Sequence, residues 1–385
     1  MWITVYSVLI TGFWVVLCIY LLINSHKMGH LMAVPAKDPG KLPSVAVIVA
    51  VRNEEEHLGK ALQSICQLDY PHYEVIVVND RSTDRTQEIL GGMSKIYPFI
   101  KLAPVKELPQ GWLGKNHALY QGYQRSSSEW LLFTDADVVY QPDTLLKALS
   151  FCVDNYTGHL VVLPEVVSRS TLLNSVLETF KMMLEVRQRP WAASNPRSSA
   201  SIGVGAFNLV HRDAYEGVGT HQAIALRPDD DLQLGAAIKK AGYKQNVLYG
   251  NDQVGLEWYG SIKEFIKGLM KNTFSVFEYN LLKVLGAVLS TLFIFVLPIP
   301  FMLISGHHTE YILALILLIV QCMLLLFKNG SSARWWYALM IPYAGILICY
   351  IMIRSALLTK KQKGIYWRDS FYSLSELKAG QKPFK

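Results

Sequence analysis

The sequence predicts an α/β fold with a doubly wound, mostly parallel sheet, accompanied by transmembrane helices. Two observations support this prediction. In the middle of the chain, short apolar runs alternate with segments of helical spacing, which is typical of βαβ units. At both ends, long apolar stretches approach or exceed the roughly 20 residues that a helix needs to cross a bilayer.

The N-terminal apolar stretch runs from Ile3 to Ile23 without a charged residue. A cleaved signal peptide is the alternative to a membrane helix. However, no basic residue precedes the stretch and no clear small-residue cleavage site follows it. We therefore expect residues 1–26 to form an uncleaved membrane anchor.

Three further membrane segments are expected near the C-terminus. They are Val284–Ser305, Tyr311–Phe327 and Trp335–Ile353. Pro298 and Pro300 predict that the first is kinked or only partly spans the bilayer. The aromatic start of the last is typical of a membrane interface. We assign residues 284–354 to membrane helices and residues 355–385 to a basic tail.

The distribution of positive charge predicts the side of the membrane. Lys27, Lys37 and Lys41 follow the first span and no basic residue precedes it, so residues 27–283 are expected in the cytoplasm of a multi-pass cell-membrane protein. If all three C-terminal segments spanned the bilayer, the tail would lie outside the cytoplasm, against the same rule. The basic residues of that tail region are Arg354, Lys360, Lys361 and Lys363. One C-terminal segment is therefore expected to be re-entrant or interfacial.

Cysteine usage and net charge exclude several classes of protein. The five cysteines are scattered without paired spacing, which argues against a disulfide framework and against a zinc site. The formal charge is +7, but no basic stripe interleaved with aromatic residues accompanies it. Attraction to anionic lipid head groups explains the charge better than nucleic acid does.

The central region alternates predicted strands and helices. The strands are Ser44–Val51, Glu74–Asn79 and Trp130–Thr134. The helices are Glu54–Cys66, Thr83–Ile96, Lys115–Arg125 and Pro142–Val153. Continuous apolar runs of this kind are typical of buried parallel strands.

Polar clusters follow the three strands. They are Arg52–Glu55, Asp80–Asp84 and Asp135–Asp137. The carboxyl ends of parallel strands share one edge, so the clusters are expected to converge on one crevice. Individually, Glu55, Ser82 and Thr83 fit the start of a helix just as well. Converging carboxylates repel one another unless a cation or ligand offsets them, and a divalent cation there can hold phosphates.

The segment Gln110–Ala118 adds a basic group to this edge. Gly111 and Gly114 suit a close backbone approach, and Lys115 lies where a helix begins. A lysine beside helix N-terminal amides is suited to a diphosphate; a surface lysine on a loop is the alternative. His117 fits a structural, hydrogen-bonded histidine better than a ligand.

Three consecutive aspartates precede another predicted helix, within Arg227–Gly235. Asp229, Asp230 and Asp231 repel one another, which raises at least one carboxyl pKa and suits a general base. A helix cap followed by a solvated first turn fits the pattern equally well. A glycine-containing run, Gly203–Asn208, and Trp258 are further candidates for lining a binding site, although core packing fits Phe207 and Trp258 better.

In this order, the motifs resemble family 2 glycosyltransferases of the GT-A fold. The matching residues are Ala50–Glu55, Val78–Asp84, Gly111–Lys115, Thr134–Asp137, Asp230–Gly235 and Gly242–Tyr243. The resemblance covers roughly residues 43–275. Together with the membrane segments, it looks most like the bacterial carotenoid branch, the diaponeurosporenoate glycosyltransferases; hopanoid-associated relatives are similar.

The resemblance implies a role for each acidic or basic residue at the donor site. Glu54 and Asp80 would contact the uridine and ribose of a UDP-sugar, and Asp84 would support that pocket. Lys115 would lie near the diphosphate. Asp135 would be the first acid of the Asp-x-Asp motif.

The resemblance also assigns the metal ligand and the base. Asp137 would be the direct ligand of Mg²⁺ or Mn²⁺. Asp231 matches the second acid of the family's Glu-Asp pair, the catalytic base. Asp230 stands where the family has glutamate, and the preceding Asp229 leaves Asp230 as an alternative base.

One departure from the family narrows the expected reaction. Processive members carry Gln-x-x-Arg-Trp after the base, whereas this chain has Phe265–Phe274 there, which we expect to form an amphipathic interfacial helix. We therefore expect inverting transfer of a single sugar from UDP-glucose to a lipid, such as a carotenoid acid. Hopanoid, diacylglycerol or polyprenyl phosphate acceptors are alternatives, as is a catalytically silent nucleotide-sugar-binding membrane protein.

Overall fold

The computed structural model describes residues 2–367 and 370–380. The chain forms two compact units. The sheet unit consists of Gly29–Val167, Arg189–Trp258 and Ser375–Lys385, and the apolar-helix unit consists of Met1–Met28, Ser168–Gln188 and Tyr259–Leu374. Residues 168–188 and 259–283, which we expected to belong to the catalytic domain, therefore group with the apolar helices.

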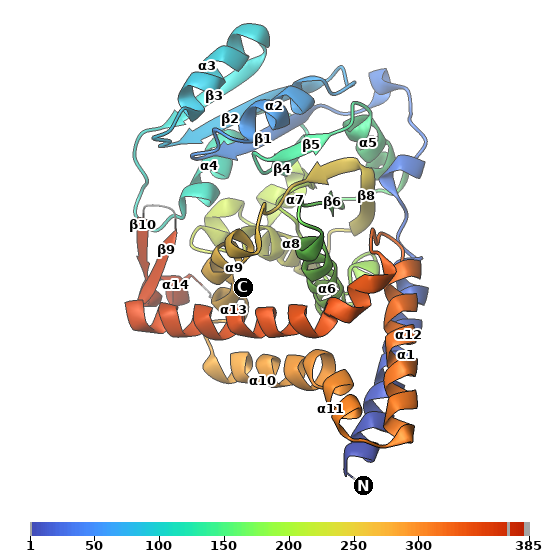
Figure 1. The fold of residues 1–385 in the computed structure, drawn as a ribbon. Coiled ribbons are helices and arrows are strands. Elements are labelled where there is room, and N and C mark those ends of the chain that lie inside the picture. The colour runs from blue at the N-terminus through green and yellow to red at the C-terminus, as the bar shows by residue number, and fades with distance from the viewer. Residues whose placement is uncertain (1, 368–369, 381–385) are drawn as a thin grey trace. The chain divides into compact units, whose positions relative to one another are not determined.

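Within the described residues, the sheet unit contains one eight-stranded sheet, ordered β3-β2-β1-β4-β7-β6-β8-β5 (Figure 1). The strands are β1 Val45–Val51, β2 Tyr73–Asp80, β3 Ile100–Val105, β4 Trp130–Thr134, β5 Val138–Tyr140, β6 His159–Val166, β7 Asn208–His211 and β8 Gln245–Leu256. Strands β3, β2, β1 and β4 are parallel neighbours, as are β6 and β8. β7 is antiparallel to β4 and β6, and β5 is antiparallel to β8. The predicted mostly parallel α/β fold is confirmed.

Helices cover both faces of the sheet. They are α2 Leu58–Cys66, α3 Thr86–Ile96, α4 Gly114–Tyr123, α5 Thr144–Asp154, α7 Arg212–Gly217 and α8 Asp230–Lys240. Val47 of β1 belongs to a core shared with α2, α3 and α5. Its neighbour Ile48 belongs to a second core shared with α4, α7 and α8. Alternate residues of one strand thus face different layers, which is why the strands are apolar throughout.

The apolar-helix unit contains the predicted membrane segments. Its helices are α1 Trp2–Ser25, α6 Thr171–Gln188, α9 Ile262–Val276, α10 Leu281–Thr291, α11 Pro298–Ile304, α12 His308–Phe327 and α13 Ile341–Gln362. A π-helical segment, Leu292–Val296, joins α10 to α11, and a 3₁₀ segment, Trp335–Met340, precedes α13. A hairpin of β9 Gly364–Trp367 and β10 Ser370–Ser373 follows, and then α14 Leu374–Ala379.

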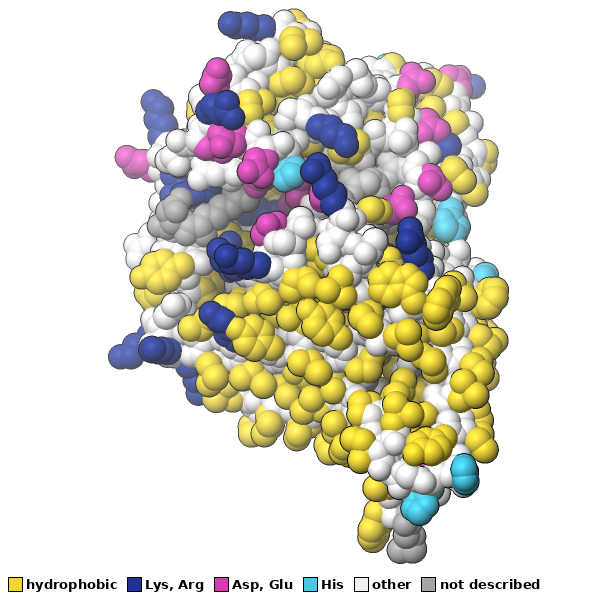
Figure 2. Space-filling view, in the orientation of Figure 1, with side chains coloured by type: hydrophobic (Ala, Val, Ile, Leu, Met, Phe, Trp, Pro, Cys, Tyr) yellow, Lys and Arg dark blue, Asp and Glu magenta, His cyan; other side chains and the backbone are white. Residues whose placement is uncertain are grey.

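Among the residues that the structure describes, three helical stretches are long and apolar enough to cross a membrane. They are Trp2–Ser25, His308–Phe327 and Trp335–Gln362. A fourth, Leu281–Val296 with Pro298–Ile304, is bent by 51°. The bend confirms the kink predicted from Pro298, which begins α11. Figure 2 shows that hydrophobic side chains cover most of the face of this unit that is turned to the viewer.

Candidate functional site

The loops after β1 and β2 are tied together by hydrogen bonds. The Asn53 N–H donates to Oγ of Ser82 over 3.0 Å, and the Thr83 N–H donates to Oδ1 of Asn53 over 2.8 Å. The Glu54 N–H donates to Oγ1 of Thr86 over 2.9 Å. Ser82 and Thr83 thus join two loops, and neither forms the N-cap of α3. This use of residues 52–57 and 81–85 explains why α2 and α3 begin later than predicted.

Asp84 also ties these two loops together. Its Oδ2 accepts the Glu55 N–H over 3.1 Å, and its Oδ1 accepts the Thr86 N–H over 3.0 Å. Burial opposes ionisation, but these hydrogen bonds with Thr86 and Glu55 outweigh it and hold the pKa of Asp84 below its usual range. Asp84 therefore stays charged and holds the backbone of Glu55, the residue after Glu54, close to the start of α3.

Asp80 lies at the end of β2, is 3% exposed and is paired with two arginines. Nε and Nη2 of Arg81 lie 2.8 and 3.2 Å from its two oxygens. Nη1 of Arg52 lies 3.5 Å from Oδ2. A Cβ at Gly114 would be 2.2 Å from the same oxygen, so only glycine allows α4 to start this close to Asp80.

Lys115, the second residue of α4, connects two of the acidic clusters. Its Nζ lies 2.8 Å from Oδ1 of Asp135 and 3.7 Å from Oδ2 of Asp230. Burial alone would lower the pKa of Lys115, but the charges of Asp135, Asp230 and Asp231 raise it well above its usual value. A solvated surface lysine was the alternative, and this environment rules it out.

Asp137 has one carboxylate oxygen, Oδ1, that is buried and has no hydrogen-bond partner among the described residues. Burial, followed by the charges of Asp135 and Glu54, raises the pKa of Asp137 to about 7. A buried carboxylate oxygen of this kind is suited to a bound cation.

The three aspartates at the start of α8, of which Asp229 is the N-cap residue, have different surroundings. Asp229 is held by Nε and Nη2 of Arg227 over 3.1 and 3.0 Å, and by Nε2 of Gln233 over 2.7 Å. Asp229 thus has a structural role at the start of α8. Asp230 is buried beside Lys115, and burial together with the Asp231 charge raises its pKa to about 7 despite that lysine.

Asp231 is less buried than Asp230 and is oriented by the backbone. Its Oδ2 accepts the Gly205 N–H over 2.9 Å, and its Oδ1 accepts the Leu232 N–H over 2.8 Å. Burial is the main cause of a raised pKa of Asp231, partly offset by Lys115. A partly accessible carboxylate with a raised pKa and a fixed orientation is suited to general-base chemistry.

Gly205 is a site residue that sequence reasoning did not identify as such. Besides its bond to Asp231, its carbonyl accepts the Asp135 N–H over 3.0 Å. A Cβ at Gly205 would lie 2.4 Å from Oδ2 of Asp135. The pair of glycines at 203 and 205 was the available signal, read as part of an acceptor segment. Phe207 of that segment is fully buried in the core.

The residues present fit a divalent cation that is coordinated partly by the protein and partly by a substrate. Within the described residues, no group of three or more His, Cys, Asp or Glu side chains is placed to enclose a metal ion. Asp137 offers an unpartnered oxygen, whereas Asp135 already pairs with Lys115. Mg²⁺ and similar ions are often held by one or two carboxylates plus substrate phosphates, which matches this donor set.

Comparison with known proteins supports the fold and indicates the family of the domain. Residues 46–219 match the model of the family described as "Glycosyl transferase family 2". The chain carries a family 2 glycosyl transferase domain. The matched region contains seven of the eight strands of the sheet, β1 to β7 (Figure 1), and the architecture is that of the GT-A glycosyltransferases.

Among curated proteins, the family 2 domain is similar to two lipid-related enzymes. A β-monoglucosyldiacylglycerol synthase from Nostoc sp. is 28% identical over 215 residues, covering 54% of this chain and 45% of that protein. A 4,4′-diaponeurosporenoate glycosyltransferase from Staphylococcus aureus (strain USA300) is 25% identical over 218 residues, covering 56% of each chain. The chain thus matches about half the length of these relatives.

Among solved structures, a mannosyltransferase from Pyrobaculum calidifontis in complex with GDP-Man and Mn²⁺ matches with a TM-score of 0.53 and 18% identity. The match covers 96% of this chain and 100% of that chain. At this identity the likeness concerns the fold.

Proposed function

We propose that the chain is a membrane-bound inverting glycosyltransferase that moves one sugar, glucose, from a UDP-sugar to a lipid acceptor. The observation that carries the proposal is the contact of Lys115 with Asp135 and Asp230. Lys115 is a basic group suited to a diphosphate, and these contacts place it beside the acids that start α8. Asp137, near Asp135, has a buried oxygen without a partner that could bind a metal ion. These are the parts that sugar transfer from a nucleotide diphosphate needs.

The donor half of the site is assigned to the loops after β1 and β2. We assign Glu54 and Asp80 to the uridine and ribose, and Asp84 to holding the two loops in register. Two arginines offset the charge of Asp80, and its carboxylate oxygens can accept hydrogen bonds from sugar or base groups. The hydrogen bonds between the loops mean that little ordering is left to occur on binding.

Asp137 would hold Mg²⁺ or Mn²⁺, which when bound neutralises charge on the donor diphosphate. The pKa of Asp137, raised to about 7, returns to lower values once a cation replaces the proton. Mn²⁺ in the mannosyltransferase of the same fold supports this choice of ion class. Asp135 positions Lys115, which stabilises the departing diphosphate.

Asp231 is assigned as the base that takes the proton from an acceptor hydroxyl. The Gly205 N–H fixes one of its oxygens, and its raised pKa brings it closer to neutral pH, where a base is most effective. Asp230 then acts through Lys115. A carboxylic acid acceptor, such as a carotenoid acid, would already be ionised and would depend less on Asp231.

The acceptor class is supported by the names of the relatives and by the apolar helices. The relatives are named for a carotenoid acid and for diacylglycerol, and both are amphiphiles that reside in a bilayer. An active site on the cytoplasmic side of that bilayer reaches such acceptors directly. Within the same proposal, diacylglycerol, hopanoid and polyprenyl phosphate remain the other lipids to test.

Mass spectrometry of membrane lipids, with and without the gene and with UDP-glucose supplied, tests the proposal. A lipid heavier by one hexose supports it and identifies the acceptor. Hydrolysis of the UDP-sugar by purified protein separates an enzyme from a silent nucleotide-sugar-binding protein, because slow hydrolysis requires working chemistry. Binding of UDP-sugar with neither lipid product nor hydrolysis would contradict the proposal.

A further inference from the structure

The apolar-helix unit indicates which of its helices cross the bilayer. α1 and α12 run in the same direction. Near their N-terminal ends, Oγ1 of Thr4 donates to Oε1 of Glu310 over 2.6 Å. At their C-terminal ends, the side chain of Asn329 donates to the carbonyls of Ser25 and Met28. If both cross the bilayer, they therefore cross it in the same sense.

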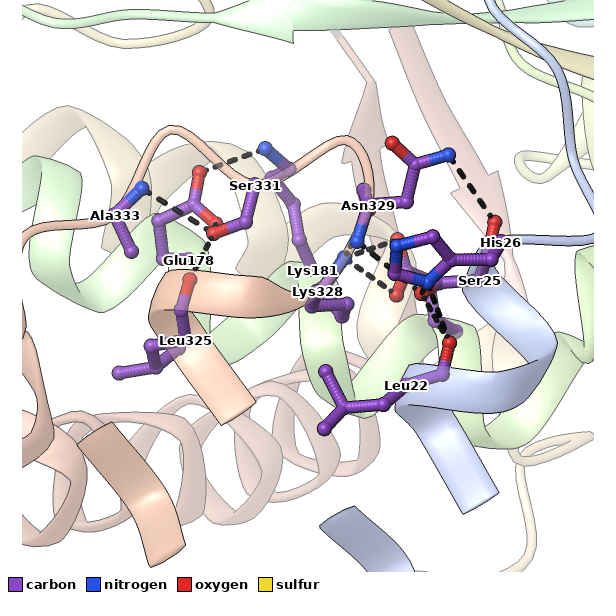
Figure 3. A network of polar contacts seen from close by, with 11 residues as sticks. Leu22, Ser25, His26, Glu178, Lys181, Leu325, Lys328, Asn329, Ser331 and Ala333 are labelled. Atoms are coloured by element: carbon purple, nitrogen blue, oxygen red, sulfur yellow. Dashed lines mark hydrogen bonds and ion pairs between the residues drawn. The ribbon is translucent and has the colours of Figure 1, made fainter. Parts of the chain in front are cut away.

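A polar layer holds the C-terminal ends of this pair (Figure 3). Lys328, directly after α12, is 3% exposed and its Nζ lies 2.8 Å from Oε2 of Glu185 on α6. Oγ of Ser331 donates to Oε2 of Glu178 on the same helix, which also pairs with Lys181 over 2.7 Å. Charged helix α6 therefore marks the water-facing end of α1 and α12.

α13 packs against α6, which carries this polar layer, and against α9. Oγ of Ser355, past the middle of α13, donates to the carbonyl of Met270 on α9 over 2.7 Å and accepts the Phe274 N–H over 3.2 Å. α9 carries exposed lysines at positions 263, 267 and 271. If α13 crossed the bilayer, α9 would carry these charges into the hydrocarbon, where charged side chains are costly.

The exposed large hydrophobic side chains of α13 lie in one stripe. They are Tyr343, Ile346, Tyr350, Ile353 and Leu357, each between 39% and 60% exposed. Their spacing of three and four residues places them on one face, while Ser355 faces α9. The exposed Arg354 donates to the hydroxyl of Tyr350 in this stripe. A helix with one apolar exposed face and one face on a polar layer is suited to lie in the plane of a membrane surface.

α10, the π segment and α11 lead from α13 to the N-terminal end of α1. Sγ of Cys349 on α13 lies 3.7 Å from the carbonyl of Val288 on α10, so α10 packs against α13. The following π segment reaches α1, where Nε1 of Trp14 donates to the carbonyl of Ile294 over 3.0 Å. The ring of Phe301 on α11 then packs on Tyr6 near the start of α1.

We propose that this unit crosses the bilayer three times, through α1, the bent α10–α11 segment and α12, and that α13 lies in the cytoplasmic surface of the bilayer. The proposal rests on the membrane location in the proposed function. It places on the cytoplasmic side the exposed basic residues Arg354, Lys360, Lys361 and Lys363, where anionic head groups attract them. The conflict with the positive-inside rule disappears, because the interfacial segment expected from the sequence is α13.

Spin-label depth measurements on the full chain in lipid vesicles test the proposal. The background is Cys322→Ala, because the other four cysteines are buried. Labels replace Tyr343, Tyr350 or Leu357 on α13 and, as the matched control, Ile312, Ile319 or Leu326 on α12. Both sets are exposed and spaced by seven residues, so consecutive labels lie ~10 Å apart along each helix.

The proposal predicts equal depths for the three labels on α13. On α12 the Ile319 label is expected ~10 Å deeper than its two neighbours. A Tyr350 label that lies ~10 Å deeper than those at 343 and 357 would show that α13 crosses the bilayer and overturn the proposal. Depth needs no catalysis, so this result is independent of whether sugar transfer is found.

The side of the tail is tested in cells with a membrane-impermeant maleimide. In the same background, His307→Cys, between α11 and α12, is expected to react in intact cells. Lys361→Cys, at the end of α13, is expected to react only after permeabilisation. Labelling of Lys361→Cys in intact cells overturns the proposal.

Discussion

Nζ of Lys115 lies 2.8 Å from Oδ1 of Asp135, which joins the first turn of α4 to the loop after β4. The same nitrogen lies 3.7 Å from Asp230 at the start of α8. One cation therefore couples the donor-side acids to the acids assigned to acceptor activation. Its removal should change both binding of the diphosphate and the titration of the neighbouring carboxyls.

Lys115→Met is expected to lower kcat/KM for the sugar nucleotide by ~10²-fold or more, the usual effect of losing a group that stabilises developing charge. Because Lys115 lowers the pKa of Asp230 and Asp231, its loss should move the acid limb of the pH–rate profile to higher pH. Lys115→Arg keeps the charge and should keep the profile. A slower Lys115→Met enzyme with an unchanged acid limb would contradict the coupling.

Stability should fall as pH rises through neutrality when no metal is bound. The pKa values of Asp137 and Asp230 are raised to about 7, above the ~4 of an unfolded aspartate. The folded state therefore binds more protons at these two carboxyls, and the stability that they contribute is complete below pH ~4 and is lost as pH rises through 7. The difference in the free energy of unfolding between Asp137→Asn and the wild type should shift by at least ~1 kcal/mol in favour of the variant between pH 5 and pH 8. Parallel unfolding curves for the two proteins at both pH values would refute this.

Two neighbouring glycines should respond differently to alanine. In Gly205→Ala, the new Cβ meets the movable Asp135 carboxylate at 2.4 Å, so activity should fall with little loss of stability. In Gly203→Ala, it meets the backbone carbonyl of Asp231 at 1.9 Å, and the free energy of unfolding should fall by ~1–3 kcal/mol. Gly91→Ala, in α3 with open space around it, is the control and should be neutral or stabilising. Denaturant unfolding and initial rates on the same preparations check both effects.

Asp229 and Asp231 should separate stability from turnover. Asp229→Asn breaks the pair with Arg227, whose side chain is only 10% exposed, and should cost ~3–5 kcal/mol because a buried charge loses its partner. Asp231→Asn should leave unfolding and UDP binding nearly unchanged while a hydroxyl acceptor is no longer used. Equal loss of UDP binding and turnover in Asp231→Asn would assign that residue to the donor.

The sequence predicted three of the four strands in the parallel half of the sheet, β1, β2 and β4 but not β3, and the convergence of the acidic loops. Continuous apolar strands and the polar residues after them are local signals. β4 was placed at its observed limits. The strands of the other half, such as β7 and β8, were not predicted, since their pairing depends on contacts distant in sequence. Gly205 was missed as a site residue for the same reason: its function lies in backbone bonds to Asp135 and Asp231.

The roles of the three consecutive aspartates needed the structure as well. In sequence, Asp229, Asp230 and Asp231 are equivalent acids before a helix. Only the fold shows that Arg227 holds the first, Lys115 lies near the second and Gly205 orients the third. The kink at Pro298 was predictable because proline acts through its own ring.

Transfer of radiolabelled hexose into lipid tests the central claim most directly. Membranes containing the wild type or Asp137→Asn are incubated with Mg²⁺ or Mn²⁺ and each of a panel of labelled UDP-sugars, UDP-glucose first, and the label in the chloroform-extracted lipid is counted. We predict labelled lipid with the wild type, and ~10²-fold less with Asp137→Asn or with excess chelator. Equal lipid labelling in the wild type, the variant and the chelated sample, or no labelled lipid from any UDP-sugar, would contradict the account.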